Sequence, residues 1–312
     1  MVERTKSEPR SDAAGAPEPP SAMPPGTLVD GRYRIVSHLG EGGMGTVLIA
    51  EHVGLGRQVA LKVLQEHIGH DPTTHKRFQR EARTLAAMSH PNIVAMNDYG
   101  IWEGKPYLVM ELLAGRTLRD LLDVEKVLPI ERALDIAQQV LRALAYAHAQ
   151  GAIHRDLKPG NVFLQALPDQ IDHVKLLDFG FAKFLHQPAS SFVSADGIIV
   201  GTPAYMAPEQ AGGKVDHRAD VYGAGVLLFE MLSGRRPFEG EPLEMIRGRL
   251  VDDAPKLAEV RPGIEIEPAL EDALARALAR RPEDRYQSAS ELASALARVT
   301  RDALRPAGTV AP

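Results

Sequence analysis

Two hydrophobic periodicities follow one another along the chain, and their order most constrains the fold. Residues 33–64 alternate apolar and polar side chains between turn residues, which predicts three strands, YRIVSHL, TVLIAEH and RQVALKVL. Two more strands are predicted in NIVAMNDYG and KPYLVMELL, with a helix over residues 73–89 before them. After Gly115 the pattern becomes helical. Strands followed by helices predict an α+β protein of two unlike lobes with a cleft between them.

The second part of the chain contains three helix patterns. Residues 130–149 carry an apolar stripe at helical spacing, whereas residues 220–232 are apolar on nearly every side and are predicted to form a central, buried helix. Gly234 is placed to end that helix. The sequence SASE at residues 288–291 fits a capping box and predicts the start of a last helix.

Composition excludes several classes of function. The net charge of -5 gives no general reason to bind nucleic acid, and the lack of cysteine removes disulfides and thiol chemistry. Residues 1–26 are rich in Pro, Ala, Ser and Glu, which predicts a disordered tail without the apolar core of a signal peptide. Residues 301–312 are predicted to be a flexible tail. The most apolar run, residues 221–232, is too short to cross a bilayer and contains Glu230, so we expect a cytoplasmic protein without a membrane segment.

A glycine-rich stretch, LGEGGMGTV, occupies residues 39–47. Gly40, Gly42 and Gly45 follow the pattern G-x-G-x-x-G, and glycines allow the backbone to approach a ligand closely. Predicted strands flank the glycines on both sides, whereas a dinucleotide-binding turn requires a helix after them. The G-K-[ST] ending of a Walker loop is absent. From the residues alone, the stretch is either an ordinary hairpin turn or a loop that covers phosphates.

Two charged residues are predicted on faces that are otherwise apolar. Lys62 shares one face of its strand with Ala60 and Leu64, and Glu81 falls on the inward stripe of the helix over 73–89. An edge strand with a snorkelling lysine is one explanation. The other is a pair between Lys62 and Glu81, because a buried carboxylate is much less costly beside a buried ammonium.

The segment HRDLKPGN at residues 154–161 places Asp, Lys and Asn at close spacing between apolar stretches. A surface turn and an active-site loop are both compatible with it. Together with GEGGMGTV, VALK, DFG and APE, in this order along the chain, it resembles the protein-kinase family. The segment GTPAYMAPEQ is most similar to bacterial serine/threonine kinases of the eukaryotic-like, Hanks type.

The resemblance implies a bilobal protein-kinase-like fold over residues 28–300. A small β-rich lobe with one helix would span residues 28–110, a hinge residues 111–115, and a larger, mostly α-helical lobe residues 116–300. The implied activity is transfer of the γ-phosphoryl group of ATP to Ser or Thr hydroxyls of proteins.

The resemblance also implies roles in the catalytic loop. Asp156 would orient the substrate hydroxyl and accept its proton, and Lys158 would neutralise the transferred phosphoryl group. Asn161 and Asp178 would bind Mg²⁺, with Mn²⁺ as an alternative. This set suits phosphoryl transfer, which depends on positioning and charge neutralisation more than on covalent chemistry.

A second set of residues is implied to bind ATP. Val47, Ala60 and Phe163 would enclose the adenine ring, and Met110 would lie at the back of the pocket. Backbone groups of Glu111 and Leu113 would hydrogen-bond adenine. The complete set is Leu39, Gly40, Glu41, Gly42, Gly43, Met44, Gly45, Thr46, Val47, Ala60, Lys62, Glu81, Met110, Glu111, Leu113 and Phe163.

Other residues are implied to be structural. Glu209 and Arg285 would pair and anchor the segment between DFG and APE, and Asp220 would brace the backbone of the catalytic loop. The packing residues implied to link the two lobes are Leu85, Met96, His154 and Phe179.

Substrate class and control follow from the same resemblance. Lys158, two residues after Asp156, is typical of serine/threonine kinases. Arg155 would pair with a phosphorylated residue, which would order the segment that carries it. The candidate hydroxyls are Ser190, Ser191, Ser194 and Thr202. Thr202 also matches a threonine that contacts the acceptor site, although a turn residue before a proline is the simpler explanation. Autophosphorylation in a homodimer is a further expectation.

Three alternatives share the fold. They are a pseudokinase that acts as a binding module, a phosphotransferase for small molecules, and a nucleotide sensor without activity. The intact residues Lys62, Glu81, Asp156, Asn161 and Asp178 argue against the first, and GTPAYMAPE argues against the second, because that segment holds protein substrates.

Overall fold

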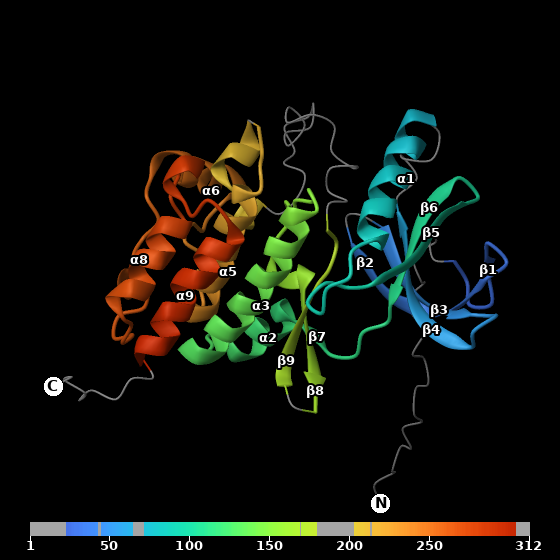
Figure 1. Ribbon diagram of the computed structural model, residues 1–312, viewed down its shortest axis with the longest axis horizontal. Coiled ribbons are helices and arrows are strands. Elements are labelled where there is room, and N and C mark those ends of the chain that lie inside the picture. Colours follow the sequence, from blue (N-terminus) through green and yellow to red (C-terminus); the bar gives the residue numbers. More distant parts are fainter. Residues whose placement is uncertain are drawn as a thin grey trace, which may run out of the picture.

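A computed structural model describes residues 23–42, 45–64, 72–168, 170–179, 203–212 and 214–303 (Figure 1). Within these ranges, the side chains of residues 72, 74, 77, 81 and 300–303 lie outside the description. A lobe of strands with one helix lies beside a larger lobe of helices (Figure 1). The predicted two-lobed α+β fold is therefore confirmed.

The smaller lobe is an antiparallel sheet of six strands in the order β1-β2-β3-β4-β6-β5. Helix α1 lies across this sheet and contacts β5 (Figure 1). The elements are β1 (Leu28–Val29), β2 (Tyr33–Gly42), β3 (Gly45–His52), β4 (Arg57–Leu64), α1 (Pro72–Ala86), β5 (Met96–Trp102) and β6 (Lys105–Glu111).

Strand β4 separates the two faces of this sheet by the alternation of its side chains. Val59, Leu61 and Val63 belong to one apolar cluster with residues of β2, β3 and β6. Leu64 belongs to a second cluster on the face covered by α1, where it packs with Phe78 of that helix. Because β4 lies between β3 and β6, it is a central strand. The explanation of Lys62 as a snorkelling residue on an edge strand is therefore wrong.

The larger lobe is built around α3, which contacts both α5 and α9 (Figure 1). None of the helices in the described ranges has the length and apolar content needed to cross a membrane. The helices are α2 (Leu118–Glu125), α3 (Ile130–Ala149), α5 (Arg218–Ser233), α6 (Pro242–Val251), α7 (Leu257–Val260), α8 (Pro268–Ala277) and α9 (Ala289–Ala303). Short 3-10 helices are η2 (Pro159–Asn161), η4 (Pro203–Tyr205), η5 (Pro208–Ala211) and η6 (Pro282–Asp284).

Helix α5 is buried along almost its whole length, as its uniformly apolar sequence predicts. It ends at Gly234, whose φ of 73° is left-handed and whose N–H donates to the carbonyl of Glu230 at 2.8 Å. Glycine adopts this conformation without the steric cost that a Cβ brings. The prediction that Gly234 ends the helix is therefore confirmed.

A second, three-stranded sheet in the larger lobe positions the segment HRDLKPGN, which precedes β8, and the segment DFG, which follows β9. It contains β7 (Arg116–Thr117), β8 (Val162–Leu167) and β9 (Gln170–Leu176) in that order. Most of the polar segment QALPDQID, residues 165–172, belongs to these strands, because Leu167 pairs with Gln170. Backbone pairing continues through polar residues there, since it needs no apolar side chains.

Order extends further at both ends than the sequence predicts. Met23 packs against the sheet, and the N–H of Gly26 donates to the carbonyl of Ile35 at 2.8 Å, so the tail expected over residues 1–26 is wrong for residues 23–26. Helix α9 continues to Ala303, into the expected flexible tail. The remaining residues of both tails lie outside the described ranges.

Candidate active site

The catalytic loop, residues 154–161, lies between α3 and β8. It is held by Asp220, a buried residue in the first turn of α5. Its carboxylate accepts from the N–H groups of His154 and Arg155, each at 2.8 Å. Nε2 of His148 contacts the same carboxylate at 2.8 Å. These bonds hold Arg155 at a φ of 65°, a left-handed conformation that is costly for a residue other than glycine.

The pKa of Asp220 reflects this arrangement. Burial raises the pKa, but the hydrogen bond and charge of His148, the charge of His154 and the N–H of Arg155 lower it by more. The pKa therefore lies below the ordinary value of 3.8. Asp220 stays ionised in the protein interior because donors from two segments surround it.

Asp156, Lys158 and Asn161 of the catalytic loop form one hydrogen-bonded cluster. Nζ of Lys158 donates to Oδ2 of Asp156 at 2.7 Å. Nδ2 of Asn161 donates to the same oxygen at 3.0 Å and to the backbone carbonyl of Asp156 at 2.7 Å. The two bonds to Oδ2 fix the Asp156 carboxylate. Among the described residues, its Oδ1 has no hydrogen-bond partner. The carboxylate therefore presents one oxygen as an acceptor.

Lys62 reaches this region from the other lobe. Its Nζ donates to Oδ1 of Asp178 at 2.7 Å, and the lysine side chain is 6% exposed against 23% for the aspartate. Asp178 has a φ of 57° and lies two residues after the end of β9. The contact joins residues 116 positions apart across the two lobes.

The two halves of the site are tied by packing and by backbone bonds. His154 and Phe179 lie with ring centroids 4.7 Å apart. Nε2 of His154 donates to the carbonyl of Leu177 at 2.9 Å, and the N–H of Leu177 donates to the carbonyl of Asn161 at 2.9 Å. These contacts therefore join the catalytic loop to the segment of Asp178.

The sequence DFG thus places its aspartate beside Lys62 and its phenylalanine beside His154. Leu85 of α1 is in contact with the cores of both lobes, and Met96 packs against the cluster under α1. These positions fit the predicted packing link between the lobes.

The glycine-rich stretch is the hairpin between β2 and β3, with strands on both sides as expected. At Gly40 and Gly42 an added Cβ would meet nothing within 4 Å, which leaves the backbone open to a ligand. At Gly45, with a φ of 140°, a Cβ would lie 2.0 Å from the carbonyl oxygen of Val63. Gly45 is therefore required by close packing on β4, whatever the hairpin binds.

Other residues predicted at the hairpin are only partly described. Leu39 is 53% exposed, and Glu41 pairs with Thr46 across the strands. Gly43 and Met44 lie outside the described ranges.

Three of the residues predicted to contact adenine, Val47, Ala60 and Met110, lie on the neighbouring strands β3, β4 and β6. Ala60 pairs with Met110 between β4 and β6, and Val47 of β3 pairs with Lys62. Phe163 lies on β8 in the other lobe, close to the backbone of Gly115.

The hinge residue Glu111 uses its side chain for structure. Oε1 accepts from the N–H of Ala95 at 2.8 Å and from Nζ of Lys175 at 2.7 Å. The backbone N–H of Glu111 is used as well, because it donates to the carbonyl of Ala95 at 3.0 Å. Leu113 is half-buried, and the adenine contacts of Glu111 and Leu113 stay predictions.

Some expectations fall outside the description. The side chain of Glu81 is outside it, so its pairing with Lys62 stays a prediction. Ser190, Ser191, Ser194 and Thr202 lie outside the described ranges altogether.

The segment around APE is anchored by a buried ion pair. Arg285, with a relative exposure of 0%, forms a bidentate pair with Glu209 at 2.7 and 2.8 Å. Nε2 of Gln210 donates to the carbonyl of Arg155 at 2.9 Å, which joins this segment to the catalytic loop.

Sequence reasoning missed a second anchor of this segment. The hydroxyl of Tyr205 donates to Glu230 at 2.6 Å, and Arg119 of α2 donates to both residues. It also missed His148 as a partner of Asp220. The polar Glu230 in an apolar helix was the one available signal, because a buried carboxylate needs a partner.

The site offers side-chain oxygens that could bind a metal ion, but too few to complete its coordination. Oδ1 of Asn161 and Oδ2 of Asp178 have no hydrogen-bond partner among the described residues, and the Nδ2 of Asn161 is already used by Asp156. In the described part of the chain, no three His, Asp or Glu side chains are placed to hold an ion alone. This donor set fits Mg²⁺, a hard cation that also takes water and phosphate oxygens.

The two-lobed fold and this cluster place the molecule in the class of proteins with the protein-kinase fold. Residues 33–296 match the protein kinase domain family. The chain therefore belongs to the protein kinase domain family.

Named relatives agree with this assignment. Serine/threonine-protein kinase pkn2 of Myxococcus xanthus is 42% identical over 276 residues, which cover 88% of this chain and 33% of the relative. Serine/threonine-protein kinase PknB of Mycobacterium leprae is 39% identical over 274 residues, 86% of this chain and 43% of the relative. The chain thus spans less than half the length of either relative.

Among solved structures, the PknI kinase domain of Mycobacterium tuberculosis is similar with a TM-score of 0.70 at 33% identity. That similarity covers 89% of this chain and 99% of the solved chain.

Proposed function

We propose that this protein is a serine/threonine protein kinase that transfers the γ-phosphoryl group of ATP to hydroxyls of protein substrates. The observation that carries the proposal is the convergence of Lys62 and Asp178 with the cluster of Asp156, Lys158 and Asn161. Relatives with 38–42% identity are named serine/threonine-protein kinases, which supports the substrate class.

Asp156 orients the acceptor hydroxyl and takes its proton. Asn161 and Lys158 hold one carboxylate oxygen, so the other is directed at the hydroxyl. Such positioning supplies much of the rate enhancement in phosphoryl transfer. Lys158 also has an ammonium beside the reacting group, where it neutralises negative charge that spreads over the phosphoryl oxygens.

Asn161 and Asp178 would hold Mg²⁺, which would supply positive charge to neutralise the phosphates. Lys62 holds the carboxylate of Asp178 in place at 2.7 Å, and among the described residues it is the only Lys or Arg that forms an ion pair with that carboxylate. With ATP bound, its ammonium would turn to the phosphates. Mn²⁺ suits the same oxygen ligands.

The sheet face that carries Ala60 and Lys62 encloses the nucleotide. Val47 and Ala60 cover one side of the adenine ring and Phe163 the other, with Met110 behind it. Leu39 to Thr46 close over the phosphates through backbone N–H groups. Glu111 and Leu113 bind adenine through their backbones, and Glu81 steadies Lys62.

Phosphorylation of the protein's own segment between DFG and APE, the activation segment, controls the enzyme. Nε of Arg155 is buried and has no hydrogen-bond partner among the described residues, which supports a role in binding an added anionic group. A phosphorylated Ser190, Ser191, Ser194 or Thr202 supplies that group. A homodimer in which one copy phosphorylates the other, and a cytoplasmic location, stay predictions.

One assay tests the activity. The protein is incubated with labelled ATP, Mg²⁺ and a generic protein substrate, beside Asp156→Asn and an Asp253→Asn control whose carboxylate is 87% exposed. We expect labelled phosphoserine and phosphothreonine with the parent and the control, and a loss of at least about a thousandfold with Asp156→Asn. Equal labelling by Asp156→Asn would contradict the proposal.

The rival functions predict other results in the same assay. A pseudokinase or sensor would bind nucleotide with no transfer, and a small-molecule kinase would label an added metabolite mixture but no protein.

A further inference from the structure

Lys175 forms an ion pair at the hinge, although the proposed reaction gives this lysine no role. Its Nζ, on β9, lies 2.7 Å from Oε1 of Glu111, the last residue of β6. The lysine side chain is 13% exposed and the glutamate side chain 31%, so the pair is partly shielded from water and salt. The pair joins residues 64 positions apart in the chain, one from each lobe.

Glu111 is also bonded to Ala95, the residue before β5. The N–H of Glu111 donates to the carbonyl of Ala95 at 3.0 Å, and the N–H of Ala95 donates to Oε1 of Glu111 at 2.8 Å. One carboxylate oxygen therefore accepts from a backbone N–H and from the Lys175 ammonium. The ammonium keeps the carboxylate on the N–H of Ala95, and both the backbone and the side chain of Glu111 are fixed.

The residues before Ala95 are bound to the larger lobe. The N–H of Val94 donates to the carbonyl of Leu176 at 3.0 Å, and the N–H of Leu176 donates to the carbonyl of Asn92 at 2.9 Å. Nδ2 of Asn92, a residue that is 5% exposed, donates to the carbonyl of Val174 at 2.9 Å. Residues 92–95 therefore lie along β9, the strand that carries Lys175.

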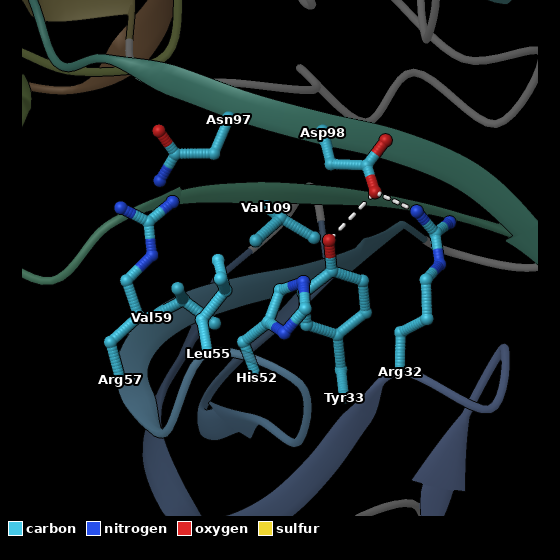
Figure 2. A pocket seen from close by; sticks show the side chains of 9 residues that line it. All are labelled: Arg32, Tyr33, His52, Leu55, Arg57, Val59, Asn97, Asp98 and Val109. Carbon is cyan, nitrogen blue, oxygen red and sulfur yellow. Dashed lines mark hydrogen bonds and ion pairs between the residues drawn. The ribbon is translucent and has the colours of Figure 1, made fainter.

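The residues after Ala95 are bound to the smaller lobe. The register of β5 shifts between Met96 and Asp98, and the intervening Asn97 lines a cavity of this lobe together with Arg57 (Figure 2). Oδ2 of Asp98 accepts from Arg32 and from the hydroxyl of Tyr33, each at 2.6 Å (Figure 2). Residues 92–98 are therefore a second connection between the lobes, beside the hinge.

We propose that Lys175 is a positioning residue for the binding of adenine, an inference that rests on the proposed function. Through Glu111 and Ala95, its charge ties the hinge to the second connection between the lobes. This sets the orientation of the hinge backbone that Glu111 and Leu113 present to adenine. Without the ammonium, the carboxylate keeps one N–H donor among the described residues and turns toward water, because a partly buried charge needs compensation.

The test compares two ligands that share the adenine ring. Adenosine has no phosphate, whereas MgADP also depends on the proposed metal ligands. Each is titrated by calorimetry into the full chain and into Lys175→Met, which keeps a long apolar side chain and removes the charge. We expect both Kd values to rise by the same factor, about five- to tenfold, because the weakened contact is with the ring that both ligands carry.

Steady-state kinetics give a second measurement. The KM for ATP should rise by the same factor in Lys175→Met, while kcat changes by less than about twofold. Lys175→Arg keeps a cation and should bring the Kd of adenosine back to within about twofold of the parent value.

Two further variants show where the effect arises. Lys256→Met is the matched control, since Lys256 is an exposed lysine of the larger lobe, and it should leave the Kd of adenosine unchanged. Glu111→Gln removes the partner charge, so adding Lys175→Met to it should weaken adenosine by less than about twofold further.

Several results would overturn the proposal. An unchanged Kd of adenosine in Lys175→Met would do so, even if the free energy of unfolding falls, because the pair would then be structural only. Weaker MgADP with unchanged adenosine would place the effect at Asp178, three residues further along the chain. Adenosine binding needs no phosphoryl transfer, so a chain that binds adenosine but transfers no phosphate contradicts the proposed function and leaves this test readable.

Discussion

Asp220→Asn is an informative change, because this buried carboxylate holds the start of the catalytic loop through two backbone N–H groups. Oδ1 accepts from the N–H of Arg155, and Oδ2 accepts from the N–H of His154 and contacts Nε2 of His148, all at 2.8 Å. Asparagine keeps the shape but has one oxygen. If the asparagine oxygen takes the place of Oδ2, the asparagine NH₂ group takes the place of Oδ1. The NH₂ group and the N–H of Arg155 are then two donors that face each other.

The cost follows from these contacts. One hydrogen bond to a charged group is lost, at about 1.5–3 kcal/mol, and a buried N–H is left without an acceptor. We expect the free energy of unfolding to fall by about 2–4 kcal/mol. The φ of 65° at Arg155 then lacks its restraint, and Asp156 follows directly, so kcat should fall by about 10- to 100-fold. The affinity for ATP should change little.

The stability difference should depend on pH in one direction. The pKa of Asp220 is lower in the folded protein than the ordinary value of 3.8. Its stabilisation is therefore fully present above that ordinary value and is lost as the pH falls through the folded-state pKa. The gap in unfolding free energy between parent and Asp220→Asn should be constant above about pH 5 and should shrink below about pH 4.

Urea unfolding from pH 3 to 7 and steady-state kinetics at pH 7.5 measure both effects. Asp253→Asn is the control, because its exposed ion pair with Arg280 should contribute less than about 1 kcal/mol. A change in stability below about 1 kcal/mol in Asp220→Asn, or a gap that does not narrow in acid, would refute the reasoning.

Two further predictions concern other parts of the fold. Arg119→Ala removes the cation that holds Tyr205 and Glu230, so we expect the free energy of unfolding to fall by about 1–3 kcal/mol. We also expect a several-fold higher KM for protein substrate at an unchanged affinity for ATP. Arg119→Lys should rescue both effects in part. Asp123→Asn is its control, since Asp123 is 62% exposed, and a proportional rise in the Kd of ATP would count against a specific role. Gly115→Ala places a Cβ 2.1 Å from the carbonyl oxygen of Leu164 at a φ of 150°, so urea unfolding should show a loss of more than about 2 kcal/mol. Gly160→Ala, where a Cβ meets nothing within 4 Å, should change stability by less than about 1 kcal/mol, and equal losses in both variants would contradict the steric argument.

Local patterns predicted a large part of this fold. The alternation in β4 placed Val59 and Lys62 on opposite faces, and the uniformly apolar run placed α5 at the centre of its lobe. Patterns failed where polar segments adopt regular structure. The hairpin of β8 and β9 extends through polar residues, because strands pair through their backbones.

The candidate site was predicted by resemblance of short motifs. Among its residues, Lys62 contacts Asp178, and Asp156 contacts Lys158 and Asn161. What the motifs did not contain is how they are supported. His148 and Arg119 carry no motif, and each is recognisable only beside its buried carboxylate, Asp220 or Glu230.

The sequence by itself determined the two lobes, the direction in which strand and helix side chains point, and the order of the catalytic motifs. These depend on periodicity and on residues close together in the chain. Only the tertiary structure decided that Lys62 meets Asp178 across 116 positions, and that Arg57 and Asn97 face one cavity. Such contacts depend on how separate elements pack, because a buried polar group takes whichever partner the packing brings within hydrogen-bond distance.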